Sequence, residues 1–274
     1  MLADFGVFGG DDRSGYLVDD LLLRGYGVIT RGVKQKRDSA ASLEELAEQA
    51  KVLVGPVPLS KYIGDREKQF DRLELCMAVK AGQLLFAGQI PEDIREIIRY
   101  NGARCVDFMK SREVQQANAV LTAEGCLAEC IAHRNVQLKG ARVCVCGYGC
   151  CGREIARVFS GLGANVTVAI RRTQSAWEAA CNGYSVCYPE GLGDILPRQE
   201  IIINTVPERI VSEEQLEKIS KASLLVEIAS TPGGFDMNDA KRKGLQAISC
   251  PGLPGRYFPR GAARILADFI VAAC

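Results

Sequence analysis

The stretch that decides the fold is Arg142-Val-Cys-Val-Cys-Gly-Tyr-Gly-Cys-Cys-Gly152. A short β-favouring run, 143–146, leads into the pattern Gly147-x-Gly149-x-x-Gly152, and a helix-compatible segment, 153–162, follows. This order of strand, glycine turn and helix is typical of a dinucleotide-binding βαβ unit. The alternative is a glycine turn with a purely structural role. We therefore predict a strand, a turn and a helix that together bind a nicotinamide dinucleotide.

Each glycine of the pattern has a mechanical task in such a unit. Gly147 permits the tight turn, Gly149 lets the backbone approach a pyrophosphate, and Gly152 lets the helix pack close to the strand. The free N–H groups and the positive dipole end of the helix then receive the phosphates. We therefore assign the three glycines, with Cys150 and Cys151 between them, to cofactor binding.

The next expected strand, 166–170, indicates which dinucleotide binds. An NAD site usually has Asp or Glu at the end of this strand, where it bonds the ribose hydroxyls. Arg171 and Arg172 stand there instead, and hydroxyls follow, including that of Ser175. Two guanidinium groups suit a 2′-phosphate, so we predict NADP as the cofactor. An ordinary solvated pair of arginines is the alternative.

Composition places the chain among globular proteins that contain no membrane span. It has 274 residues, 47% of them apolar and 24% charged, and a net charge of +1. This near-neutral charge gives no reason to expect nucleic acid or an anionic membrane as a partner. No apolar run reaches the length of a membrane span, and the N-terminus lacks the pattern of a signal peptide. We expect a cytoplasmic protein.

Twelve cysteines and a single histidine make the thiol content unusual. There is no paired C-x-x-C, so a zinc site has poor support and no metal is expected. Disulfides do not persist in a reduced cytosol. We expect most of these cysteines to be small buried hydrophobic residues. Those placed in apolar runs or on a predicted helix are Cys126, Cys130, Cys144, Cys146, Cys181, Cys187 and Cys250.

The first 116 residues alternate between β-favouring and helix-compatible segments, which predicts a parallel sheet covered by helices. The expected strands are 4–8, 26–30, 51–54, 83–87 and 104–108, and the expected helices are 14–24, 42–49, 65–80 and 91–100. We interpret this region as a substrate-side domain.

A long apolar-periodic segment follows, and we expect a helix from Ala117 to about Arg134 within an interdomain segment, 117–137. A second α/β domain is expected over 138–258, and an apolar helix over 259–274 returns to complete the first domain. The predicted fold class is α/β. It has two doubly wound parallel-sheet domains, the second a Rossmann dinucleotide-binding domain, joined by the long helix and the returning helix. The expected strands of the second domain are 142–146, 166–170, 185–188, 200–204, 224–228 and 246–250.

Ligands of open α/β sheets collect outside the carboxyl ends of the strands, so the chemistry is expected in those loops and in a cleft between the domains. In the first domain Arg13, within Gly9–Ser14, could bind a carboxylate, and Ser60 could assist. At the start of the long helix Thr122 and Glu124 are further candidates for positioning a substrate. The alternative for the loop that contains Arg13 is a capped turn with a structural role. The alternative for Thr122 and Glu124 is that they are ordinary polar groups at a helix start.

The later loops of the second domain are expected to line the cofactor site. The candidates are Thr205, Val206, Pro207 and Ser230. The alternative for 230–234 is a plain turn before a helix that Asp236 caps. His133, the single histidine, lies roughly 16 Å along the helix axis from Thr122, so a cap or surface role is favoured over catalysis.

Taken together, these motifs resemble those of the family of dipicolinate synthase A subunits. The resemblance runs in order along nearly the whole chain. Its N-terminal motifs are Gly9-Gly10-Asp11-x-Arg13, Gly55-Pro-x-Pro58 and Asn118-Ala-x-x-Thr-Ala-Glu-Gly125. The later motifs are the glycine turn, Asn204-Thr-x-Pro207, Ala229-Ser-x-Pro-Gly-Gly-x-Asp236 and Gly252-Leu-Pro-Gly255-x-x-x-Pro259.

The resemblance implies an NADP-dependent oxidoreductase that forms dipicolinate from a dihydro- or hydroxytetrahydrodipicolinate of the lysine pathway during sporulation. It implies that the partner is the flavoprotein-like B subunit of dipicolinate synthase and that the substrate is a small dicarboxylate, and it leaves open a homo-oligomer. Two alternatives remain. One is an NADP-dependent dehydrogenase of another small carboxylate, of the amino-acid or methylene-folate type. The other is a non-catalytic NADP-binding redox sensor.

Overall fold

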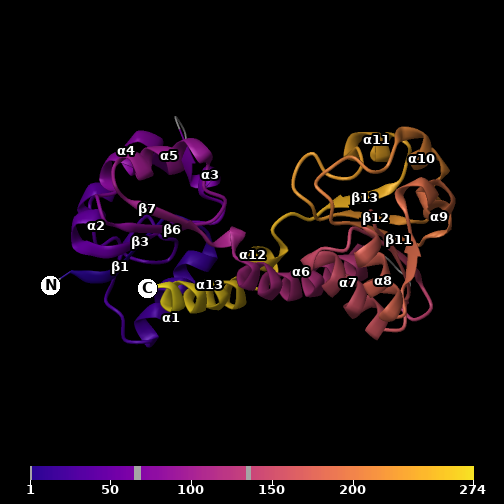
Figure 1. Ribbon diagram of the computed structural model, residues 1–274, viewed down its shortest axis with the longest axis horizontal. Helices are drawn as coiled ribbons and strands as arrows, with labels where there is room; N and C mark the ends of the chain where they lie inside the picture. The colour runs from indigo at the N-terminus through magenta and orange to yellow at the C-terminus, as the bar shows by residue number, and fades with distance from the viewer. Residues whose placement is uncertain (1, 65–68, 134–136) are drawn as a thin grey trace. The chain divides into compact units, whose positions relative to one another are not determined.

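A computed structural model describes residues 2–64, 69–133 and 137–274. The chain divides into two compact units, one running up to Asn118 and including Phe258–Cys274, the other Ala119–Tyr257. Each unit has its own parallel sheet with helices packed on it (Figure 1). The predicted α/β fold class with two parallel sheets is confirmed, as are the long helix and the C-terminal helix.

The first unit is built on a five-stranded sheet in the order β2-β1-β3-β6-β7. Its strands are β1 (Ala3–Phe8), β2 (Val28–Arg31), β3 (Ala50–Val54), β6 (Leu84–Ala87) and β7 (Arg104–Asp107), and β4 (Ile63–Gly64) pairs with β5 (Phe70–Asp71) in a small separate sheet. Its helices are α1 (Asp12–Leu23), α2 (Leu43–Gln49), α3 (Leu59–Tyr62), α4 (Arg72–Ala78), α5 (Glu92–Tyr100), the 3₁₀ turn η1 (Phe108–Lys110) and α13 (Pro259–Ala273).

Both faces of this sheet are covered, because its strands are apolar on both sides. One face packs against α1 and α13, where Val7 and Phe86 meet Leu21 and Leu266. The other packs against α2, α4 and α5 (Figure 1). The strand order changes direction between β1 and β3, so their carboxyl ends flank the switch point at which such sheets bind ligands.

The second unit is built on a six-stranded sheet in the order β10-β9-β8-β11-β12-β13, the order of a Rossmann domain. Its strands are β8 (Arg142–Cys146), β9 (Asn165–Ala169), β10 (Ser185–Cys187), β11 (Ile201–Asn204), β12 (Leu224–Glu227) and β13 (Gln246–Ser249). Its helices are most of α6 (Arg112–His133), α7 (Cys150–Gly161), α8 (Thr173–Cys181), η2 (Pro189–Gly191), α9 (Leu192–Ile195), η3 (Leu196–Arg198), α10 (Glu213–Lys218), α11 (Met237–Arg242) and α12 (Leu253–Tyr257).

The alternating side chains of these strands face two separate cores. Val143 and Val145 of β8 pack with residues of α6, α7 and α8 on one face. Cys144 and Cys146, which alternate with them, pack with residues of α9, α10 and α11 on the other. The expectation of buried cysteines is confirmed for both. Cys181 contradicts it, because it lies exposed in the last turn of α8.

Three expected helices have different bounds. The helix expected over 65–80 is the shorter α4, because Phe70–Asp71 forms β5 and the Asp71 carboxylate caps the helix at Leu73; residues 65–68 lie outside the described ranges. Helix α6 begins at Arg112 rather than Ala117, since Ser111 Oγ accepts from Val114 N; its expected end at Arg134 also lies outside the described ranges. Helix α7 begins three residues earlier than expected, at Cys150.

In the ranges that the structure describes, no helix is long and apolar enough to cross a membrane.

Candidate functional site

The glycine turn after β8 is built around two positions that only glycine can occupy. Gly147 has a φ of 96°, in the left-handed region. A Cβ on Gly152 would lie 2.1 Å from the Gly147 carbonyl oxygen, inside any allowed contact. Gly149 differs from both, because a Cβ there would meet nothing within 4 Å. The turn therefore has a fixed backbone and an open position at the N-cap of α7, a cradle that fits a pyrophosphate.

The loop after β11 packs directly against this turn. Thr205 donates to the Cys146 carbonyl oxygen twice, from its backbone N at 2.9 Å and from Oγ1 at 2.8 Å. A Cβ on Gly147 would lie 2.4 Å from the same Oγ1. Val206 is half-buried behind Thr205, and Pro207 is exposed. The structure therefore brings Thr205, Val206 and the glycine turn together.

On the other side of β8, the end of β9 carries the two arginines. The turn is bonded to this strand, because Gly147 N donates to the Ala169 carbonyl oxygen at 2.9 Å. The Arg171 side chain is 75% exposed, and its Nη1 lies 3.7 Å from Oε2 of Glu208. Arg172 is the exposed N-cap residue of α8, and Ser175 is half-buried in the first turn of that helix.

Helix α6 contributes to the same turn through Thr122. The Thr122 side chain is hydrogen-bonded to the Cys151 thiol; burial raises the pKa of Cys151, and this bond offsets part of that rise. Cys150 and Cys151 are both half-buried. Glu124, two residues further along α6, is exposed. The structure thus places Thr122 beside the glycine turn.

A buried carboxylate that the sequence interpretation missed lies at the end of β12. Glu227 is 5% exposed and Asn204, its neighbour in register on β11, is fully buried. Asn204 Nδ2 lies 2.8 Å from Oε1 and 3.0 Å from Oε2 of Glu227. Burial raises the pKa of Glu227, although hydrogen bonds from Asn204 and from backbone N–H groups work in the opposite direction. An acid within the apolar run 224–228 is the signal that could have revealed it.

The loop after β12 curves over this pair. Ser230 is exposed, the Thr231–Pro232 peptide bond is cis, and Gly233 has a φ of 74°. Asp236 then caps α11 by accepting from Asn238 N at 2.9 Å and from Asp239 N at 3.0 Å. The alternative interpretation of this segment, a turn before a capped helix, is therefore correct for Asp236.

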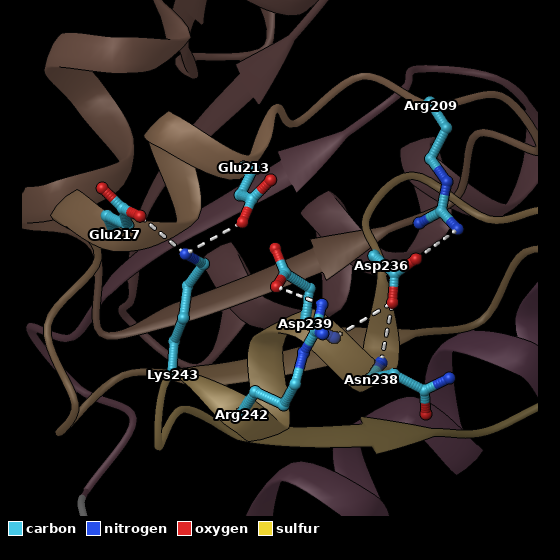
Figure 2. A network of polar contacts seen from close by, with 8 residues as sticks. All are labelled: Arg209, Glu213, Glu217, Asp236, Asn238, Asp239, Arg242 and Lys243. Carbon is cyan, nitrogen blue, oxygen red and sulfur yellow. Dashed lines mark hydrogen bonds and ion pairs between the residues drawn. The ribbon is translucent and has the colours of Figure 1, made fainter.

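A network of polar contacts joins residues that follow β11 to residues that follow β12 (Figure 2). Arg209, two residues beyond Pro207, lies 3.3 Å from Asp236, so an ion pair joins the loop after β11 to the cap of α11. In the same network Lys243 lies 2.7 Å from Glu217 of α10 (Figure 2). These pairs are exposed and individually weak. Their geometry nevertheless connects the segments that follow β11 and β12.

In the first unit, the switch point between β1 and β3 is formed by Gly9–Asp11 and by 55–58. Asp11 caps α1, and its carboxylate faces the Arg13 guanidinium, with Nε at 2.9 Å and Nη2 at 2.7 Å. Nη2 also donates to the carbonyl oxygen of Val57, which precedes a cis peptide bond to Pro58. Arg13 therefore connects the loops after β1 and β3.

Helix α3 lies next to this ion pair. Ser60 is exposed on it. Burial raises the pKa of Tyr62, and the Asp11 carboxylate adds to the rise, so the phenol of Tyr62 lies within the field of the pair. The structure thus brings Arg13 and the α3 residues to one edge of the first sheet.

His133, the single histidine, lies in the last turn of α6 with 46% of its side chain exposed. Its Nδ1 lies 3.0 Å from the carbonyl oxygen of Glu129, one turn earlier. Glu129 itself is buried and pairs with Arg256 at 2.8 Å. This placement agrees with a role at the helix end. In the described part of the chain, no group of three or more His, Cys, Asp or Glu residues could hold a metal ion.

Comparison with known families assigns the two parts of the chain separately. Residues 4–109 match the N-terminal domain of the dipicolinate synthase A subunit. Residues 114–257 match the NAD binding domain of S-adenosyl-L-homocysteine hydrolase. A curated relative, the A subunit of dipicolinate synthase from Bacillus subtilis (strain 168), is 30% identical over 187 residues, which is 68% of this chain and 63% of that protein. Less than two thirds of that relative is therefore matched.

Solved structures agree with this assignment at the level of the fold. The A chain of dipicolinate synthase from Bacillus subtilis has a TM-score of 0.86 and 24% identity, covering 100% of this chain and 96% of that one. The dipicolinate synthase A subunit from Bacillus halodurans has a TM-score of 0.84 and 23% identity, covering 99% and 97%. We conclude that the chain belongs to the family of dipicolinate synthase A subunits, with a nicotinamide dinucleotide-binding domain as its second part.

Proposed function

We propose that this protein is an oxidoreductase that uses NADP to convert a reduced dipicolinate precursor of the lysine pathway into dipicolinate during sporulation. The observation that carries the proposal is the match of residues 4–109 to the N-terminal domain of dipicolinate synthase A subunits, in one chain with an NAD-binding domain. The balanced reaction removes two hydrogens: dihydrodipicolinate and NADP⁺ give dipicolinate, NADPH and a proton. A hydroxytetrahydrodipicolinate must first lose water.

In this proposal the cofactor lies across the carboxyl ends of β9, β8 and β11. The 2′-phosphate faces Arg171, Arg172 and Ser175, because two guanidinium groups at this strand end match its charge. The pyrophosphate lies on the backbone of Cys150–Gly152, where the open Gly149 leaves room for it. The nicotinamide half lies toward Thr205–Pro207 and Ser230. The bound nicotinamide supplies the hydride acceptor.

The substrate must be recognised through its two carboxylates. We propose that Arg13 binds one of them, with help from Ser60 on the neighbouring helix. Because Nε and Nη2 of Arg13 face Asp11, an incoming carboxylate has to share the guanidinium with Asp11 or displace it. We propose that Thr122 acts by fixing Cys151 in the cofactor turn and that Glu124 is a second polar group for positioning the substrate. Formation of the aromatic ring needs little acid or base assistance from the chain.

A turnover assay tests this function. The purified protein is mixed with freshly formed dihydrodipicolinate and NADP, with and without the B subunit proposed as its partner. We expect NADPH absorbance and dipicolinate absorbance to rise together in a one-to-one ratio. Reduction of NADP only by an amino acid or by methylene-tetrahydrofolate would support the other dehydrogenase class. NADP binding without turnover on any of these substrates would support a redox sensor.

A further inference from the structure

We propose that the buried pair Glu227–Asn204 is a positioning device for the nicotinamide half of the cofactor and does not contribute to binding of the adenosine half. The inference rests on the proposed function, because it assumes that a nicotinamide dinucleotide lies across β9, β8 and β11. Glu227 and Asn204 do not contact the reacting atoms in this proposal. They act through the backbone of the two loops that follow β11 and β12.

The first step is that the Asn204 side chain is hydrogen-bonded to the backbone of the loop that follows β11. Its Nδ2 donates to the Val206 carbonyl oxygen at 2.8 Å, and its Oδ1 accepts from Val206 N at 3.1 Å. The side-chain amide of Asn204 is therefore hydrogen-bonded to both the N–H and the C=O of Val206. Thr205, between them, donates twice to the end of β8. The position of the Asn204 carboxamide thus sets the path of 205–207 beside the glycine turn.

The second step is the control of Asn204 by Glu227. The Glu227 carboxylate accepts from Asn204 Nδ2 with both oxygens, which fixes which way the carboxamide faces. Without that acceptor, rotation of the carboxamide would exchange its oxygen and nitrogen and turn donors toward Val206 N. Glu227 therefore selects the orientation in which Asn204 can bond both groups of Val206.

The third step joins the loop after β12 to the same carboxylate. Ala229 N donates to Oε1 at 2.9 Å and Gly234 N donates to Oε2 at 2.8 Å. The turn lies so close that a Cβ on Gly234 would be 2.4 Å from Cγ of Asn204. Ile210 N in turn donates to the Gly234 carbonyl oxygen at 2.9 Å. One carboxylate thus fixes two loops of the second unit relative to each other.

The chemistry of the site makes glutamate hard to replace, even by glutamine. Both oxygens of Glu227 accept N–H donors, and these donors, including the Phe235 backbone, are neutral. Glutamine would turn an NH₂ group toward either Ala229 N or Gly234 N, since each side of the carboxylate faces a donor. Either orientation places two buried donors against each other and leaves at least one N–H unsatisfied.

The arginines, by contrast, belong to a different strand end. Arg171 and Arg172 follow β9, on the opposite side of β8 from β11 and β12. Their contact with the loop after β11 is the exposed pair of Arg171 with Glu208, 3.7 Å apart, and exposed pairs of this kind are weak. Loss of the Glu227 contacts should therefore change the loops on the β11 side while the end of β9 keeps its structure. This separation gives the proposal a selective signature that general destabilisation lacks.

The test compares two probes in Glu227→Gln. NADP spans both halves of the site, and 2′,5′-ADP contains the adenosine half alone. We expect the Kd for NADP to rise about tenfold or more, and the Kd for 2′,5′-ADP to change less than about twofold, by titration calorimetry. Asp239→Asn is the matched control, since Asp239 is also a buried acid of the second unit and pairs with Arg242 instead. It should leave both affinities unchanged.

Asn204→Ser provides a second variant, because it removes the two hydrogen bonds to Val206 and leaves the Glu227 carboxylate in place. It should give the same selective loss. Equal loss of both probes in these variants, or no loss of NADP affinity, overturns the positioning role. If the unmodified protein binds 2′,5′-ADP and NADP with no gain from the nicotinamide half, or binds neither, the proposed function fails instead.

Discussion

Asp11 and Arg13 form a two-point ion pair at the start of α1, with Nε and Nη2 of the guanidinium 2.9 and 2.7 Å from the carboxylate oxygens. Burial works to raise the pKa of Asp11, but the bonds from Arg13 outweigh it and the pKa is lowered. The Arg13 side chain is 16% exposed and also donates to the Val57 carbonyl oxygen. Arg13 therefore joins two loops at the switch point of the first sheet in addition to any role in substrate binding.

Replacing Arg13 by lysine tests both roles at once. Lysine keeps the positive charge but loses the planar fork that bonds a carboxylate at two points. We expect kcat/KM for the dicarboxylate to fall about ten- to a hundredfold, with the Kd for NADP unchanged. Asp11→Asn is the companion variant, because asparagine still caps the helix but no longer neutralises the guanidinium. Unaltered kinetics in Arg13→Ala would leave Arg13 as a structural residue only.

The choice of dinucleotide should depend on Arg171 and Arg172. A charge-assisted contact to a 2′-phosphate contributes about 1.5–3 kcal/mol, so replacing both arginines by alanine should weaken NADP about ten- to a hundredfold. NAD, which has no phosphate there, should bind as before. The Kd of each dinucleotide for both proteins is the measurement. Equal weakening of NAD and NADP would show that these arginines do not read the 2′-phosphate.

Glu208 offers a finer check of the same site, because it lies 3.7 Å from Arg171. Glu208→Gln removes this competing carboxylate and should tighten NADP by about two- to fivefold, the range expected of an exposed ion pair. The effect should disappear in about 0.5 M salt, since exposed charges are screened there. A gain that persists at high salt would have to come from a change in the loop itself.

The glycine turn allows a paired experiment, because its glycines differ in the space around them. Gly149→Val should fold normally, since a Cβ there meets nothing within 4 Å, yet it should abolish dinucleotide binding by filling the pyrophosphate position. Gly152→Ala should lower the thermal stability of the protein instead, because its Cβ would strike the Gly147 carbonyl oxygen. Calorimetric titration and thermal unfolding separate the two. A Gly149→Val protein that binds NADP normally would place the phosphates elsewhere.

The fold could be predicted because its signals are local. Glycine spacing predicts the turn after β8, since the left-handed backbone at Gly147 and the contact at Gly152 exclude side chains. The continuous apolar run 143–146 favours a strand covered on both faces, and the structure places its residues in two cores. The bounds of α4 and α6 were harder to predict, since they depend on caps at Asp71 and Ser111 that compete with several other polar residues.

The parts of the site that escaped prediction depend on contacts between distant segments. Glu227 and Asn204 are brought together by the register of β11 and β12, which no local pattern specifies. The bond between Thr122 and Cys151 depends on how α6 packs on α7, so no local pattern could have placed Thr122 beside the glycine turn. The orientation of the Arg13 guanidinium depends likewise on the carbonyl oxygen of Val57, which is 44 residues away in the sequence.

The cysteines should react with alkylating reagents at rates that depend on their exposure and on the pKa of each thiol. At pH 8, alkylation with N-ethylmaleimide should modify the exposed thiols of Cys181 and Cys274 before the buried ones. Burial raises the pKa of Cys105 and of Cys250 to about 11, so about one in a thousand of these thiols is ionised at pH 8. Their modification should therefore be slow and should accelerate about tenfold for each pH unit up to pH 10, as measured by peptide mass mapping.

NADP should protect the thiols of the glycine turn from the same reagent. Cys150 and Cys151 are half-buried in the first turn of α7, where the pyrophosphate is proposed to lie on the backbone. Saturating NADP should slow the modification of Cys150 and Cys151 about tenfold or more, because the bound phosphates would block access of the reagent to them. Cys181, at the C-terminal end of α8, should react at the same rate with and without NADP. Gly149→Val should remove the protection together with the binding. If Cys150 and Cys151 react equally fast when calorimetry shows the protein saturated with NADP, the pyrophosphate does not occupy the start of α7.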